Sequence, residues 1–180
     1  MKNQKGFTLV EMAVVLVIIG ILMGAVLKGQ ELIKSAKEKK FFTKIRYLAS
    51  AQFTYLDRVG RYAGDAPNNP DGIIDSDSQA WDDLKAQQLV GDNDKRHVFN
   101  GEFIFGGGIS PYGNYNYIRA TRVPAWVARS FDSKIDSVNT HTDGRIGQEG
   151  NVRWGSTTGR NYDSESDPNN ARDLYWWFDR

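Results

Sequence analysis

The amino-acid sequence opens with a long run of apolar residues. From Phe7 to Leu27, every position is apolar or glycine except Thr8 and Glu11. A helix over this run extends about 31 Å, at ~1.5 Å per residue, which matches the thickness of the hydrocarbon core of a bilayer. The pattern therefore predicts a helix that spans a membrane.

After Leu27 the pattern changes to that of an amphipathic helix. Apolar residues recur at steps of three and four, with charged residues between them. We expect the helix to continue over 28–58, to end near Gly60, and to pack one stripe of side chains. That stripe consists of Leu32, Ile33, Ala36, Phe42, Ile45, Leu48, Ala49, Phe53 and Leu56.

The remainder, 59–180, contains short segments separated by turn-forming residues, which is typical of a small α+β head. A turn-rich stretch at 67–77 precedes a predicted helix over 78–91, with Ser78 as its cap and Trp81, Leu84 and Leu89 facing inward. Because the glycine and asparagine runs are short, no linker separates a second domain.

Alternating β-prone residues predict an antiparallel sheet in this head. The predicted strands cover 102–105, 115–120 and 152–154, and a second short helix covers 123–136. The segment 139–150 is expected to be a loop.

The last residues, 173–180, gather Trp and Tyr side chains next to Arg180. Such a cluster fits a binding surface for carbohydrate, single-stranded DNA or a partner subunit. It also fits a final strand that buries its aromatic side chains in the sheet, which is the interpretation we favour.

Composition narrows the choice of function. The 180 residues carry a net charge of +1, which gives no support for a strongly basic nucleic-acid surface. The chain has no cysteine, which excludes disulfides, thiolate metal sites and a cysteine nucleophile. The two histidines, His97 and His141, lie in polar stretches without a neighbouring nucleophile, so we expect both at the surface and no enzymatic activity.

The acid within the apolar run needs an explanation. A carboxylate in a membrane helix costs about 2.5–3.5 kcal/mol on insertion scales, so Glu11 requires a partner or a function. A secretory signal does not fit, because the apolar run is too long and no small-residue cleavage site follows it. Lysines flank the run on both sides, so charge alone does not settle its orientation.

The segment Lys5–Met12, with the sequence KGFTLVEM, resembles the class III signal of type IV pilins and type II secretion pseudopilins. The resemblance implies that prepilin peptidase cleaves between Gly6 and Phe7 and that the new amine of Phe7 is methylated. Residues 1–6 would then be a leader, 7–27 a membrane and filament-core helix, 28–58 the second half of that helix, and 59–180 the α+β head.

The resemblance also implies a function and partners. The chain would be a structural subunit, a major or minor pilin or a pseudopilin, of a type IV pilus or a type II secretion filament. It would stand in the inner membrane with its head outside the cytoplasm, and join other pilin subunits through an assembly platform and ATPase. The protonated Phe7 amine of one subunit would pair with the Glu11 carboxylate of a neighbour.

The alternative is a membrane-anchored binding module that holds calcium, carbohydrate or DNA and never polymerises. The neighbourhood of Gly6, Phe7 and Glu11 favours the filament subunit, because a plain anchor does not need it. The absence of the disulfide loop that is common in type IV pilins favours a pseudopilin or a minor pilin.

Calcium is the one cofactor for which the sequence offers ligands. An EF-hand alignment fails, because Pro67 and Ser78 occupy the places of its first and last carboxylates. A different loop site remains open, although we favour a solvated turn. Its ligands would be Asp65, Asp71, Asp75 and Asp77, and a weaker candidate lies at 163–167.

Overall fold

The computed structural model describes residues 8–108, 115–135, 151–154 and 171–179. The chain divides into two compact units, Met1–Lys39 and Lys40–Arg180. The helix α1, Leu9–Val59, contributes to both, and each unit is described by itself. The predicted loop at 139–150, the acidic stretch at 163–167 and His141 lie outside the described residues.

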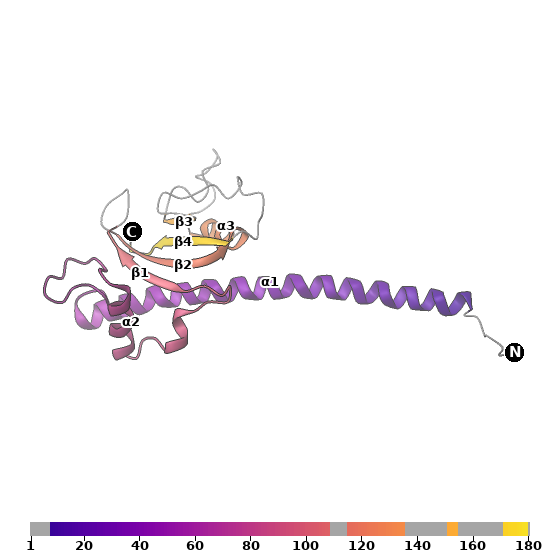
Figure 1. Ribbon diagram of the computed structural model, residues 1–180, viewed down its shortest axis with the longest axis horizontal. Helices are drawn as coiled ribbons and strands as arrows, with labels where there is room; N and C mark the ends of the chain where they lie inside the picture. Colours follow the sequence, from indigo (N-terminus) through magenta and orange to yellow (C-terminus); the bar gives the residue numbers. More distant parts are fainter. Residues whose placement is uncertain (1–7, 109–114, 136–150, 155–170, 180) are drawn as a thin grey trace, which may run out of the picture. The chain divides into compact units, whose positions relative to one another are not determined.

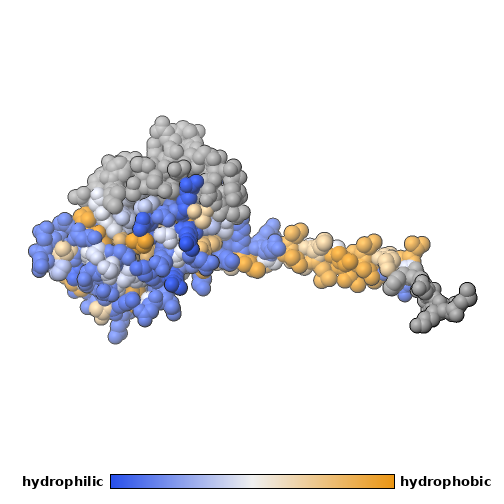
Figure 2. All heavy atoms as spheres, in the orientation of Figure 1, coloured by the Kyte–Doolittle hydropathy of each residue, from blue (hydrophilic) through white to orange (hydrophobic). Residues whose placement is uncertain are grey.

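The first unit is the N-terminal part of α1. Its apolar window has a mean hydropathy of 2.7, and none of it is buried by the rest of the chain. Figure 2 shows this part of the helix covered by apolar side chains. By length and composition, the helix is able to cross a membrane, as the sequence predicts.

The second unit, which we call the head, places the C-terminal part of α1 against a four-stranded antiparallel sheet (Figure 1). The strands are β1 (Phe103–Gly107), β2 (Asn116–Pro124), β3 (Val152–Trp154) and β4 (Ala171–Trp177), in the order β1-β2-β4-β3. Around the sheet lie α2 (Asp77–Ala86), the short 3₁₀ helix η1 (Asp92–Lys95) and α3 (Ala125–Ile135). The predicted α+β fold is confirmed.

The C-terminal aromatic segment is a strand, as favoured above. Register pairs join Ile118 to Trp176 on one side of β4, and Val152 to Trp176 on the other side. Because β4 therefore has a neighbour at both edges, it lies inside the sheet. The side chains of Leu174, Tyr175 and Trp177 are buried.

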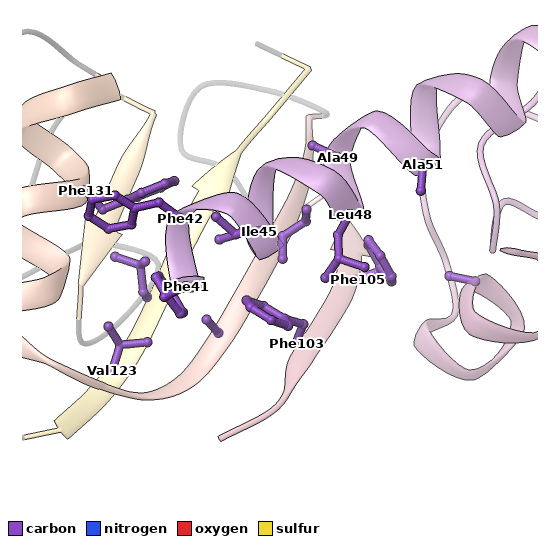
Figure 3. Close-up of a cluster of buried hydrophobic side chains, with 14 of the residues drawn as sticks. Phe41, Phe42, Ile45, Leu48, Ala49, Ala51, Phe103, Phe105, Val123 and Phe131 are labelled. Carbon is purple, nitrogen blue, oxygen red and sulfur yellow. The ribbon is translucent and has the colours of Figure 1, made fainter. Parts of the chain in front are cut away.

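The core forms where α1 meets the sheet (Figure 3). The ring of Phe41 stacks on Phe103 at 5.7 Å, and the ring of Phe42 lies 5.2 Å from Phe131 of α3. The burial of aromatic side chains is among the largest stabilising contributions to a globular core.

The buried face of α1 differs from the predicted stripe. Its central positions follow steps of four and three, and they are Phe41, Ile45, Leu48, Gln52 and Tyr55. Phe53, which we expected inside, is 40% exposed, and Leu32 and Ile33 are 63% and 59% exposed. The prediction ran one stripe through the whole amphipathic segment, whereas α1 begins to pack only at Phe41 and includes polar Gln52.

The ends of α1 and α2 show which local signals stop a helix. The end of α1 at Val59 confirms the prediction, since Gly60 has a φ of +82° and its N–H donates to the Leu56 carbonyl at 2.8 Å. The expected cap of α2 was wrong. Ser76, and not Ser78, accepts from the N–H of Gln79, and the helix ends at Ala86 instead of near Gly91.

The placement of His97 also differs from the prediction, since its side chain is buried, at 8% exposure, and does not lie at the surface. Its ring lies 5.2 Å from Phe41 and 5.0 Å from Phe103. Nε2 donates to the Thr121 carbonyl at 2.8 Å, and Nδ1 accepts from the N–H of Phe99 at 3.3 Å. Burial lowers the pKa of His97 to about 4, so the ring is neutral at physiological pH.

The pKa of His97 predicts a pH dependence of stability. Between pH 6.5 and about 4, the unfolded chain binds a proton at His97 that the folded head does not bind. The free energy of unfolding therefore falls as the pH falls through this window, by up to about 3 kcal/mol from this residue alone. Urea unfolding of the full chain in detergent, followed by tryptophan fluorescence at several pH values, measures it.

The matched control is His97→Gln, which keeps a side-chain donor for Thr121 but does not titrate. The carboxylates of the head titrate equally in both proteins, so the difference between their pH slopes isolates His97. Equal slopes would show that His97 is not buried in the folded head.

Candidate functional site

The first candidate segment is the beginning of α1, where Thr8 and Glu11 form a reciprocal cap. The backbone N–H and the hydroxyl of Thr8 donate to Glu11 Oε2 at 2.7 and 2.9 Å. The Thr8 hydroxyl in turn accepts from the N–H of Glu11 at 3.2 Å. These contacts satisfy N–H groups that lack partners inside the helix, and they place a negative charge at its positive end.

The cap changes how Glu11 is understood. Glu11 was expected to be a charge in need of a partner, but Thr-x-x-Glu before an apolar run is also the signature of a capping box. Glu11 is therefore hydrogen-bonded within its own chain. Gly6 and Phe7, the predicted processing residues, lie outside the described residues.

Beyond this cap, residues 12–27 of α1 are all apolar or glycine. Large residues along it are well exposed, including Leu16, Ile21 and Leu27. Gly20 and Gly24 interrupt them, and a Cβ added at either would meet nothing else in the chain. A helix that is apolar on all sides is typical of a segment surrounded by lipid or by other apolar helices.

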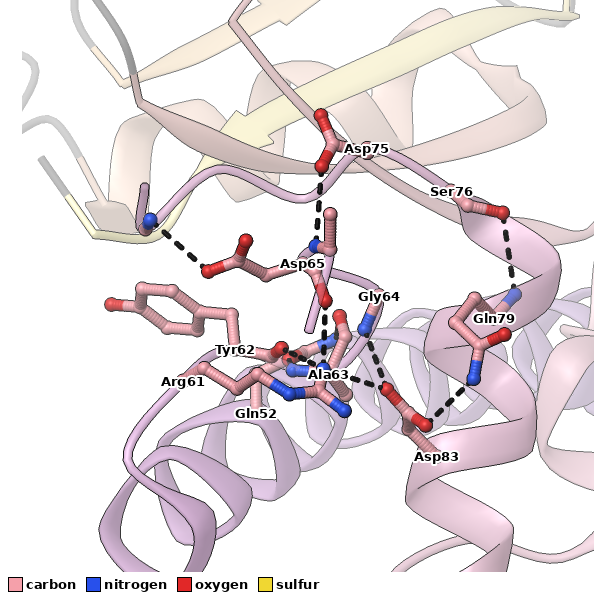
Figure 4. Close-up of polar contacts among 12 residues, drawn as sticks. Gln52, Arg61, Tyr62, Ala63, Gly64, Asp65, Asp75, Ser76, Gln79 and Asp83 are labelled. Atoms are coloured by element: carbon pink, nitrogen blue, oxygen red, sulfur yellow. Dashed lines mark hydrogen bonds and ion pairs between the residues drawn. The ribbon is translucent and has the colours of Figure 1, made fainter. Parts of the chain in front are cut away.

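The second candidate segment is the loop that follows α1, which a polar network holds in place (Figure 4). The buried side chain of Gln52 accepts from the N–H of Ala63 at 3.0 Å and donates to its carbonyl at 3.4 Å. Arg61 donates to the Asp65 carbonyl at 2.8 Å. The polar residue inside the α1 interface is thus explained, because it fixes the path of the chain after the helix.

Asp83 of α2 is the centre of this network. Its Oδ2 accepts from the N–H of Gly64 at 3.1 Å and from Arg61 at 3.0 Å, and its Oδ1 accepts from Gln79 at 2.8 Å. Burial raises the pKa of Asp83, but the hydrogen bonds from Gly64, Gln79 and Arg61 outweigh it and hold the pKa below its usual range. The carboxylate therefore remains charged and bound to the loop at neutral pH.

A buried asparagine joins the same loop to the sheet. The side chain of Asn116 on β2 accepts from the N–H of Ile74 at 2.8 Å and donates to the Gly72 carbonyl at 2.8 Å. Asp179 accepts from the backbone N–H and the side chain of Asn116 at 2.8 and 2.6 Å. The loop is thus held at its beginning by α2 and at its end by β2.

The four carboxylates of the calcium prediction lie in and beside this loop, and each accepts hydrogen bonds from the protein. Asp65 accepts from the N–H of Gly72, Asp71 from that of Ile73, and Asp75 from that of Ala66. Asp77 accepts from the indole N–H of Trp81 and forms an ion pair with Lys95 at 3.0 Å.

This arrangement favours a turn stabilised by its own side chains. Within the described ranges, no group of three or more Asp, Glu or His side chains is placed to hold a metal ion. The second oxygen of Asp65 is buried without a hydrogen-bond partner. The calcium site at Asp65, Asp71, Asp75 and Asp77 stays a prediction.

Comparison with known proteins gives one result. Residues 1–27 match the family model described as the prokaryotic N-terminal methylation motif. This motif is the prepilin signal of type IV pilins and pseudopilins, so the resemblance read from KGFTLVEM is confirmed for this segment. No curated protein and no solved structure matches the chain.

The Asp83 network predicts a specific loss of stability. Asp83→Ala leaves the N–H of Gly64 without its acceptor and removes the ion pair with Arg61, which we expect to lower the free energy of unfolding by about 2–4 kcal/mol. The neighbouring Asp82→Ala is the control, because Asp82 is exposed on the same helix, and it should change stability by less than about 0.5 kcal/mol. Equal effects in urea unfolding would contradict the role given to Asp83.

Proposed function

We propose that this chain is a structural subunit of a type IV pilus or a type II secretion filament and that it assembles through α1. The observation that carries the proposal is the prepilin signal at residues 1–27, whose apolar part forms the exposed beginning of α1. A binding module with a plain anchor would need the apolar helix but not the signal.

The processing steps follow from this proposal. Prepilin peptidase removes residues 1–6 and methylates Phe7, after which 7–27 anchors the subunit in the inner membrane and later forms the filament core. Residues 28–58 and 59–180 then stand outside the cytoplasm, and an assembly platform with its ATPase moves the subunit into the filament. The Thr8–Glu11 cap survives this cleavage, because both residues follow the cleaved bond.

Assembly replaces lipid around α1 with neighbouring helices. Lipid tails are as apolar as leucine, so the gain comes from close packing and not from the removal of water. Gly20 and Gly24 form a small-xxx-small pair that allows a neighbouring backbone to approach closely. The exposed side chains between Leu9 and Leu27 supply the rest of the surface.

Glu11 has two roles in this proposal. Within its own chain it caps α1, and between chains its charge pairs with the Phe7 amine of a neighbour, which is mostly protonated at neutral pH. A misplaced neighbour leaves both charges unpaired in an apolar medium, so the pair favours one register.

Mass spectrometry tests the processing. The protein recovered from its native cell membrane should begin at N-methylated Phe7. A chain that still begins at Met1, in cells with an active prepilin peptidase, would contradict the proposal and favour the membrane-anchored binding module.

Two substitutions separate the roles of Glu11. Glu11→Gln retains a side chain that can cap α1 but removes the charge, so the subunit should stay stable in the membrane while sheared filaments fall roughly tenfold or more. Thr8→Val removes the cap hydroxyl but keeps the charge, and it should assemble close to the wild-type level. Normal filament yield from Glu11→Gln would show that capping suffices and that charge pairing plays no part.

A further inference from the structure

One end of the head carries a groove with an excess of positive charge. The groove has a volume of about 840 Å³ and lies between α1 and the segment Asn93–Val98, with Lys40, Lys44 and Arg96 in its lining. A second hollow of about 630 Å³ shares Arg96 and adds Arg122 from β2. The two hollows therefore present four cationic side chains from three parts of the head.

Only part of this charge is neutralised inside the head. Lys44 pairs with Asp94, and Arg96, which is 82% exposed, lies 3.7 Å from Glu102. Lys40 and Arg122 have no ion-pair partner among the described residues. An exposed cation that forms no ion pair within its own chain is available to pair with a carboxylate of another molecule.

The backbone conformation at Arg122 directs its side chain toward the second hollow. Its φ is +57°, a conformation that is rare for a residue other than glycine. It lies where the pairing of β2 with β4 shifts register, between Ala120 and Val123. Such irregularities redirect a side chain at the border of a sheet, and here the exposed Arg122 lines the hollow.

The other end of the head carries exposed carboxylates. Asp57 lies in the last turn of α1, and Asp71 and Asp75 lie in the loop that Figure 1 shows beyond the end of that helix. None of the three has an ion-pair partner among the described residues. Lys40 and Asp57 are about 25 Å apart along α1, so the charges of opposite sign are well separated compared with a Debye length of ~8 Å.

We infer that the cationic groove receives the acidic loop of a second copy of this chain, with Asp71 of one head against Arg122 of the next. A contact between two unlike ends is heterologous, and it repeats into an open filament. Pairing like ends would instead bring charges of the same sign together. This inference rests on the proposed function and names the head contact that accompanies packing of α1.

The first test exchanges charges in the full chain. Arg122→Glu and Asp71→Arg should each lower the yield of sheared filaments several-fold, and the double variant should restore it, because the pair is rebuilt with reversed polarity. Arg46→Glu is the control, since Arg46 is an exposed cation on α1 outside the groove, and it should leave the yield unchanged.

The second test uses the absence of cysteine from the chain. Filaments of the Arg122→Cys/Asp71→Cys variant, treated with a short thiol-specific crosslinker, should give a ladder of linked subunits in denaturing gels. Each single variant supplies one thiol per subunit and should give no ladder.

The outcomes distinguish this inference from the proposed function. Filaments that form normally but show neither rescue nor a ladder overturn the head contact and leave the filament subunit intact. No filaments from the wild-type chain overturn the proposed function itself. A third outcome is that Arg122→Glu abolishes binding of a DNA probe while Asp71→Arg leaves the filament yield unchanged. The groove would then bind an external polyanion, and the second-copy contact would be wrong.

Discussion

The structure depends on one constraint, which is that the single helix α1 must satisfy two environments. Up to Lys39 the large apolar side chains that the structure describes are exposed, whereas from Phe41 onward one face is buried under the sheet. A fully apolar surface suits lipid and neighbouring helices, and a one-sided apolar surface suits a globular core. The rings around Phe41 and Phe103 mark where the second environment begins.

The sequence predicted those features that local residues determine. The end of α1 before Gly60 and the strands β1, β2 and β3 follow from glycine conformation and from alternation, and both are properties of short segments. The apolar N-terminal helix follows from composition alone. The helices and strands in this order were enough to predict the α+β class of the head.

What the sequence did not reveal depends on contacts between distant segments. Gln52 is buried because its side chain forms hydrogen bonds with the backbone of Ala63. His97 is buried because the backbone groups of Thr121 and Phe99 satisfy both ring nitrogens. Polar residues satisfied in this way look like surface residues in a periodicity analysis. The cap at Thr8 and Glu11 is different, since the Thr-x-x-Glu spacing is a local signal that the sequence does contain.

The place of β4 in the sheet has a consequence for how the protein is made. Tyr117 of β2 pairs with Trp177, so the centre of the sheet joins segments that are far apart in the chain. Contacts of such long range form late in folding, because the closure of a long loop precedes them. The head therefore cannot complete its sheet until residues 171–177 are available to pair with β2. In the topology proposed above, the maturation of each subunit would follow the passage of this strand across the membrane.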